Sequence, residues 1–222
     1  DLSIIGKLKN KENLNILFYG DSITFGWNSS ALSDASPFLP DWGKLTVLGL
    51  KNRYGYTKVV EGDEAFSGIG NIRYINTAVS GTSAVWGLEN IQNNVVRYSA
   101  DIVFIAFGMN NPKMDPAAFK DTLCKMIFEI RKDNSDCNIV LVATTHPNPN
   151  IVCTRGHREA FVPVLHQIKN ELGNITVSDM TTLHTRLLNA KPYHHMTGNN
   201  INHPNDFLMR QYAIMALHAL ND

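Results

Sequence analysis

Short apolar runs, rich in β-branched and aromatic residues, recur along the chain. They alternate with longer segments in which apolar positions follow helical spacing. Apolar runs of this length predict buried strands of a parallel sheet, and the segments between them predict crossover helices. The predicted strands, five in all, cover residues 14–19, 72–76, 101–107, 137–144 and 174–178. This pattern predicts an α/β fold with helices on both faces of a five-stranded parallel sheet.

The helices are predicted by apolar spacing together with start signals such as Asp115-Pro116. They cover residues 42–52, 83–98, 116–132, 156–172, 180–188 and 204–220. The polar residues 1–13 predict a surface lead-in, and residues 27–41 and 57–71 predict loops. No internal repeat, low-complexity tract or linker interrupts the pattern, so one domain is expected over residues 1–222.

The first predicted strand ends in Gly20-Asp21-Ser22. A glycine followed by a turn-forming aspartate lets the chain leave the strand sharply. Ser22 therefore lies just past the carboxyl end of a strand, the edge where open α/β sheets bind ligands. A serine there is well placed as a nucleophile, although a lone serine after a strand is more often a turn residue or a helix N-cap.

Composition excludes several classes of protein. Lys plus Arg and Asp plus Glu both number 20, so the formal net charge is zero, and no basic cluster indicates a nucleic-acid or anionic-membrane partner. No apolar run is long enough to span a bilayer. Three cysteines without C-x-x-C spacing (Cys124, Cys137 and Cys153) predict neither a disulfide framework nor a zinc site. The chain begins at Asp1 without a signal peptide, as expected of a mature form or an excised domain, and the compartment stays open.

Acyl transfer by a serine requires a base for the hydroxyl proton and hydrogen-bond donors for the developing oxyanion. His203, just before the last predicted helix, is a candidate base. Gly81 offers a backbone N–H without a side chain in the way, and Asn110 offers an amide N–H. Both follow predicted strands, so the parallel topology brings them to the same edge as Ser22.

These residues resemble the SGNH hydrolases, also called the GDSL esterase/lipase family. The resemblance rests on four ordered blocks, which are Gly20-Asp21-Ser22-Ile23-Thr24, Asn76-Thr77-Ala78-Val79-Ser80-Gly81, Gly108-Met109-Asn110-Asn111 and His203-Pro204. It implies a three-layer, flavodoxin-like α/β/α sandwich, with Ser22 as nucleophile and His203 as base. It also implies that Gly81 and Asn110 form the oxyanion hole. The Gly-x-Ser-x-Gly elbow of α/β-hydrolases does not occur.

Two positions depart from the family pattern. Asn111 replaces an aspartate that we interpret as structural, and Asn200 replaces the aspartate that orients the histidine. Asn200 is a possible orienter through its amide oxygen, as in Cys-His-Asn proteases. A backbone carbonyl, Asp179 or Asp206 are the alternatives, and the sequence does not choose among them.

Three further residues are possible contacts for substrate, namely Asp21, Trp86 and His146. Trp86 follows the Gly81 turn and would suit a sugar face, although helix packing explains it equally well. His194 and His195 lie near His203, but no carboxylate or cysteine stands at ligand spacing among them, so we predict no metal site and no cofactor.

The sequence therefore predicts a serine esterase that removes short acyl groups, acetyl above all, through an acyl-enzyme on Ser22. Polar loops around the site and the resemblance to carbohydrate acetylesterases favour an O-acetylated carbohydrate or another small ester as substrate. The alternatives are a lysophospholipase or thioesterase of the same family, and a carbohydrate-binding module that has lost the chemistry. The oligomeric state is not predicted.

Overall fold

The computed structural model describes residues 4–62, 64–66, 68–151, 156 and 158–221. Its sheet has six parallel strands in the order β2-β3-β1-β4-β5-β6. The strands are β1 (Leu14–Gly20), β2 (Lys58–Glu61), β3 (Asn71–Asn76), β4 (Ile102–Ala106), β5 (Asn138–Ala143) and β6 (Ile175–Asp179). Without β2 the order is that of flavodoxin-like folds. The predicted α/β sandwich is thus confirmed.

The expectation of five strands was wrong by one. The additional strand is β2, which lies inside the stretch 57–71 that we expected to be a loop. It pairs with β3 alone, from Lys58 opposite Asn71 to Glu61 opposite Tyr74. Of its four residues only Val60 is buried, so β2 is a short edge strand without the apolar run of a central strand.

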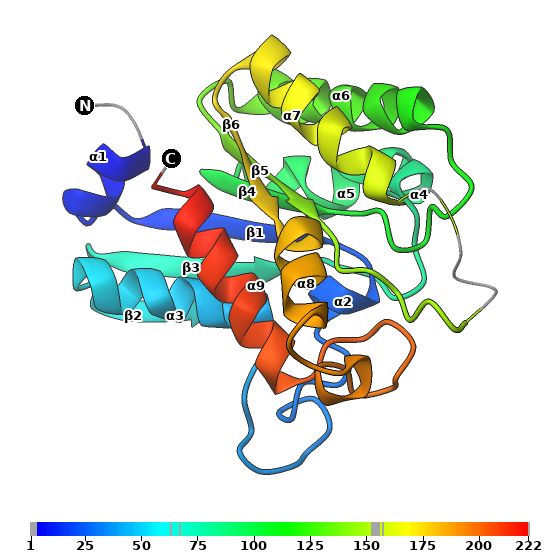
Figure 1. Cartoon of the computed structure of the whole chain (residues 1–222). Coiled ribbons are helices and arrows are strands. Elements are labelled where there is room, and N and C mark those ends of the chain that lie inside the picture. Colours follow the sequence, from blue (N-terminus) through cyan, green and yellow to red (C-terminus); the bar gives the residue numbers. More distant parts are fainter. Residues whose placement is uncertain (1–3, 63, 67, 152–155, 157, 222) are drawn as a thin grey trace.

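The helices form the outer layers, and Figure 1 shows α6 and α7 on one side of the sheet and α3 and α9 on the other. Their bounds are α1 (Ile4–Lys9), α2 (Ser22–Phe25), α3 (Trp42–Tyr54), α4 (Ala84–Glu89), α5 (Ile91–Asn94), α6 (Pro116–Asp133), α7 (Phe161–Leu172), α8 (Met180–Leu188) and α9 (Asp206–Ala219). Short 3-10 turns cover Val96–Tyr98, Arg158–Ala160 and Tyr193–His195.

Three predicted elements differ in detail. The helix expected over residues 83–98 is divided into α4, α5 and the 3-10 turn. The helix expected from residue 156 begins as a 3-10 turn at Arg158 and becomes α-helical at Phe161. Residues 4–9, expected to be a surface lead-in, form α1 and bury Ile4 and Leu8 in the core.

Alternate side chains of each strand belong to two separate hydrophobic cores, because successive residues of a strand point to opposite faces of the sheet. In β1, Ile16 and Phe18 belong to the core under α3 and α9, whereas Leu17 and Tyr19 belong to the core under α6 and α7. The central strand is therefore apolar at nearly every position. Its carboxyl end lies where the strand order reverses between β3 and β4, the position at which open α/β sheets bind ligands.

Candidate active site

Ser22 is the first residue of α2, directly after β1. Asp21 is the N-cap of that helix, and its Oδ1 accepts the Ile23 N–H at 2.9 Å. The turn needs glycine at position 20, since an added Cβ would lie 2.5 Å from both the Ala106 carbonyl oxygen and the Thr24 hydroxyl. This packing holds Ser22 at the carboxyl edge of the sheet, where it is 5 % exposed.

His203 lies in the loop between α8 and α9, and Figure 1 shows this loop beside α2. Its Nε2 is 3.0 Å from Ser22 Oγ, so the two residues form a hydrogen-bonded pair across 181 positions of the sequence. An antiparallel bridge between Thr197 and Pro204, and a bond from the Gly198 N–H to the His203 carbonyl at 3.0 Å, hold the loop in place. Burial lowers the pKa of His203.

The other ring nitrogen, His203 Nδ1, faces Asn199. Asn199 Nδ2 lies 3.0 Å from Nδ1, while Asn199 Oδ1 accepts three backbone N–H groups of the same loop. Asn200, the orienter suggested by the motif, points elsewhere. Its carbonyl and side-chain oxygens accept from Asn148 Nδ2 at 2.8 and 3.3 Å.

The two aspartates considered as alternatives also have other partners. Asp179 caps α8, where its carboxylate accepts the Thr182 N–H at 2.9 Å and the Thr182 hydroxyl at 2.6 Å. Asp206 accepts the Ser30 N–H at 2.8 Å. Of the residues that the structure describes, none brings a carboxylate within hydrogen-bonding distance of the His203 ring.

The candidate oxyanion donors lie around the same edge. Gly81 has a φ of +78° and an exposed backbone in the loop after β3, a conformation that favours glycine. Asn110 Nδ2 donates to the Thr82 carbonyl at 3.0 Å and lies 3.5 Å from Asp21 Oδ2. Asn111 has a structural contact, because its Oδ1 accepts the Ala84 N–H at the start of α4. Whether Gly81 and Asn110 hold an oxyanion remains a prediction.

Asp21 is the most perturbed acid near the site. Its side chain is fully buried, and this desolvation raises the pKa of Asp21 to about 7, against the opposing effects of the Ile23 N–H and the Arg158 charge. Arg158 is 6 % exposed and donates from Nε and Nη2 to the Met109 carbonyl, the residue before Asn110. Sequence reasoning missed Arg158, because an isolated arginine near the start of a predicted helix gives no signal of a buried contact.

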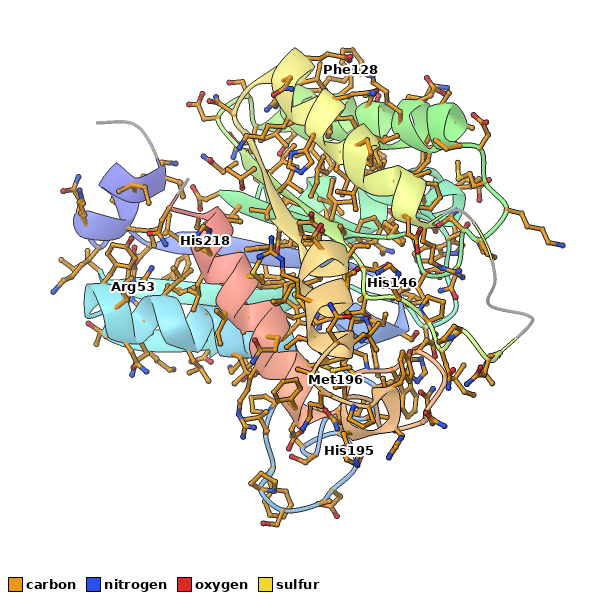
Figure 2. All side chains as sticks on the ribbon, viewed as in Figure 1. Arg53, Phe128, His146, His195, Met196 and His218 are labelled. Carbon is orange, nitrogen blue, oxygen red and sulfur yellow. The ribbon has the colours of Figure 1, made fainter. Side chains whose placement is uncertain are left out.

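A cavity of about 670 Å³ opens between the loop after β5 and α8. It contains one predicted contact residue, His146, whose Nε2 lies 2.7 Å from Thr185 Oγ1 of α8 (Figure 2). Asn148 and Arg158 also line it, and they connect it to the His203 loop and the Asn110 loop.

The tryptophans near the site differ in exposure. Trp86 is partly buried and packs against the core, with its ring 6.3 Å from that of Tyr19. Trp27 is 44 % exposed, lies next to the ring of Phe25 at 5.8 Å and donates its indole N–H to Ser80, the neighbour of Gly81. An exposed aromatic surface thus adjoins both α2 and the Gly81 turn.

Within the described ranges, no group of three or more His, Cys, Asp or Glu side chains is placed to hold a metal ion. His194 and His195 contact each other, with ring centroids 4.3 Å apart, while His203 faces Ser22. Cys124 and Cys137 are free, and Cys153 lies outside the described residues. None of the described helices has both the length and the apolar character that crossing a membrane requires.

Comparison with solved structures finds the same fold. A two-domain esterase active on acetylated mannans, crystallised with mannopentaose, is 19% identical with a TM-score of 0.73, over 98% of this chain and 52% of the other. This chain thus spans about half the length of that esterase. A catalytic mutant of an acetylxylan esterase from Geobacillus stearothermophilus is 18% identical, with a TM-score of 0.71 over 93% of this chain and 94% of the other. A lipase/acylhydrolase from Enterococcus faecalis is 19% identical, with a TM-score of 0.67 over 92% and 94%.

A search of curated proteins found no match. The sequence profile of the GDSL-like lipase/acylhydrolase family, in contrast, matches residues 18–210, which include all four of the motif blocks and the Ser22–His203 pair. The chain belongs to this family of carboxylic ester hydrolases.

Proposed function

We propose that this protein is a serine esterase that removes acetyl and other short acyl groups from carbohydrate. The observation that carries the proposal is the 3.0 Å contact between Ser22 Oγ and His203 Nε2 at the carboxyl edge of the sheet. A hydroxyl within hydrogen-bonding distance of an imidazole is the arrangement that nucleophilic acyl transfer requires.

In the proposed reaction, Ser22 Oγ attacks the ester carbonyl carbon and its proton passes to His203 Nε2. The tetrahedral oxyanion accepts hydrogen bonds from the backbone N–H groups of Ser22 and Gly81 and from Asn110 Nδ2. Asn110 Nδ2 carries two protons, and one of them already donates to the Thr82 carbonyl, which leaves the other for the oxyanion. The imidazolium protonates the leaving alcohol, and water hydrolyses the acyl-enzyme by the same route in reverse.

Two features favour a carbohydrate alcohol. Phe25 is the last residue of α2, the helix that begins with Ser22, and Trp27 follows it; both side chains are exposed. An exposed aromatic ring is suited to stack on the apolar face of a sugar. The structural neighbours named above include esterases active on acetylated mannans and xylan, which directs the first assays to those polymers.

The test is release of acetate from acetylated manno- and xylo-oligosaccharides, with Ser22→Ala as the matched variant. We expect turnover by the wild type and its loss in the variant, while circular dichroism shows an unchanged fold. An organophosphate should label wild-type Ser22. Turnover retained by Ser22→Ala would contradict the nucleophile assignment, and no labelling together with no acetate release would favour a binding module that has lost the chemistry.

A further inference from the structure

The orientation of the Asn199 side chain follows from its own hydrogen bonds. One terminal atom accepts the backbone N–H groups of Ile201, Asn202 and His203 at 2.9, 3.0 and 3.0 Å. Only the amide oxygen can accept these bonds, because an NH₂ group has no lone pair available as an acceptor. This terminal atom is therefore Oδ1, and the other is Nδ2.

The position of Nδ2 determines where His203 carries its proton. Nδ2 lies 3.0 Å from His203 Nδ1 and 3.1 Å from Asn202 Oδ1, so its two protons have two acceptors. His203 Nδ1 then accepts, and a neutral imidazole that accepts at one nitrogen is protonated at the other. That other nitrogen is Nε2, 3.0 Å from Ser22 Oγ, so the ring donates to the serine instead of accepting its proton.

We propose that Asn199 is the positioning residue that sets the tautomer of His203, and that it holds the ring proton on Nε2 in the resting enzyme. The proposal rests on the proposed function, because it concerns the base of that reaction. For Nε2 to take the Ser22 proton, the ring must first carry its proton on Nδ1, where it meets the amide protons of Asn199. Turning the amide over would relieve this conflict but would point its NH₂ group at three backbone donors. The hydrogen bonds of Asn199 therefore disfavour the His203 tautomer that can accept the Ser22 proton, and each turnover must overcome this preference.

Asn199→Asp tests this directly. One carboxylate oxygen still accepts the three backbone N–H groups, so the loop keeps the bonds that shape it. The other oxygen accepts a proton on His203 Nδ1, and the Asn202 amide can turn to donate to the carboxylate. In serine proteases the reverse change, Asp to Asn, lowers kcat about 10⁴-fold mainly through the wrong tautomer, which is a known example. We expect Asn199→Asp to raise kcat/KM for p-nitrophenyl acetate by at least about tenfold.

Asn200→Asp is the matched control. It places the same new carboxylate one residue away, at the position suggested by the family motif, where the side chain meets Asn148 and not the His203 ring. We expect its kcat/KM to stay within about threefold of the wild type. A gain in Asn200→Asp with none in Asn199→Asp would overturn the proposal.

Two readouts separate positioning from a merely structural effect. Long-range ¹H–¹⁵N spectra of His203 should show the Nε2–H tautomer in the wild type and the Nδ1–H tautomer in Asn199→Asp. The acidic limb of the kcat/KM profile should move to higher pH in Asn199→Asp, since a carboxylate beside the ring favours its charged form.

A wild-type spectrum of the Nδ1–H tautomer would overturn the proposal whatever the activity. If the wild type shows Nε2–H but neither protein cleaves any ester, the proposed function fails and the tautomer assignment stands. A folded Asn199→Asp that cleaves esters no faster than the wild type would overturn the proposal while leaving the esterase function intact.

Discussion

Asp21 combines two properties that oppose each other. Its carboxylate caps the helix that begins with Ser22, and its side chain is fully buried. Replacing it with asparagine keeps an N-cap of nearly equal quality, because asparagine and aspartate are about equally favoured there. Asp21→Asn therefore removes the buried charge while it keeps the bond to the Ile23 N–H.

The expected effect follows from the pKa. Burial raises the pKa of Asp21 to about 7, so between its unfolded value and about 7 the folded chain binds the proton more tightly than the unfolded chain. The stabilisation from this group is complete at low pH and is lost as the pH rises through about 7. At about 1.4 kcal/mol per pH unit of full titration, the loss between about pH 5 and about pH 8 is about 3 kcal/mol.

The assay is urea denaturation of both proteins across this pH range, analysed as the difference between their free energies of unfolding. The difference is needed because burial lowers the pKa of His184 to about 4, which makes the unfolded chain the tighter proton binder and raises stability with pH. This contribution is common to both proteins and cancels. We expect the free energy of unfolding of Asp21→Asn, relative to that of the wild type, to rise by about 3 kcal/mol between about pH 5 and about pH 8.

The control is Asp115→Asn, which removes a carboxylate from the N-cap of α6 at a solvent-exposed site. It separates loss of an N-cap carboxylate from loss of a buried charge. If the free energies of unfolding of the wild type and Asp21→Asn change in parallel with pH over the whole range, Asp21 is ionised in the folded protein without a desolvation cost. That result would refute the reasoning.

Three further predictions concern substrate and packing. Trp27→Ala should raise KM for acetylated oligosaccharides about three- to tenfold and change kcat/KM for p-nitrophenyl acetate less than about twofold. Trp27→Phe should keep most of the affinity for the oligosaccharides, and equal effects of Trp27→Ala on both substrates would exclude a sugar contact. Acetyl esters should be cleaved much faster than octanoyl esters, and a rate that rises with chain length would instead support a lipase or thioesterase. Gly87→Ala should lower the free energy of unfolding by about 1–3 kcal/mol in urea, since the added Cβ would lie 2.7 Å from the Phe107 ring; an unchanged midpoint would contradict it.

Much of the architecture could be predicted because buried strands have a strong pattern. The central strand β1 is buried at six of its seven positions, so its apolar run stands out from its surroundings. The edge strand β2 lacks this signal, since only Val60 is buried and a charged residue stands at each end. A four-residue edge strand takes its stability from pairing with β3, which no local pattern encodes.

The site shows the same limit. The nucleophile and base candidates were found because each belongs to a short motif at the end of a predicted element. The residue that contacts His203 Nδ1 was not identified from the sequence. Asn199 and Asn200 are adjacent asparagines, and the motif spacing favours Asn200. The hydrogen bonds of the loop decide between them. Asn200 has a left-handed φ of +55° and turns its side chain toward Asn148, which leaves Asn199 against the imidazole.

The sheet divides the hydrophobic core in two, and this division has a consequence for the order in which the protein folds. The core under α6 and α7 takes its buried residues from the stretch between Leu17 and Ile175, all of which precede α9 in the sequence. The core under α3 also needs Met209, Tyr212 and Ala216 of α9, which follows Ile175 in the sequence. His203 lies shortly before α9, in the loop that leads into this helix, so the position of its ring depends on how α9 packs. We therefore expect the Ser22–His203 pair to form only once α9 has packed on the sheet, so labelling of Ser22 by an organophosphate would report closure of the core under α3 and α9.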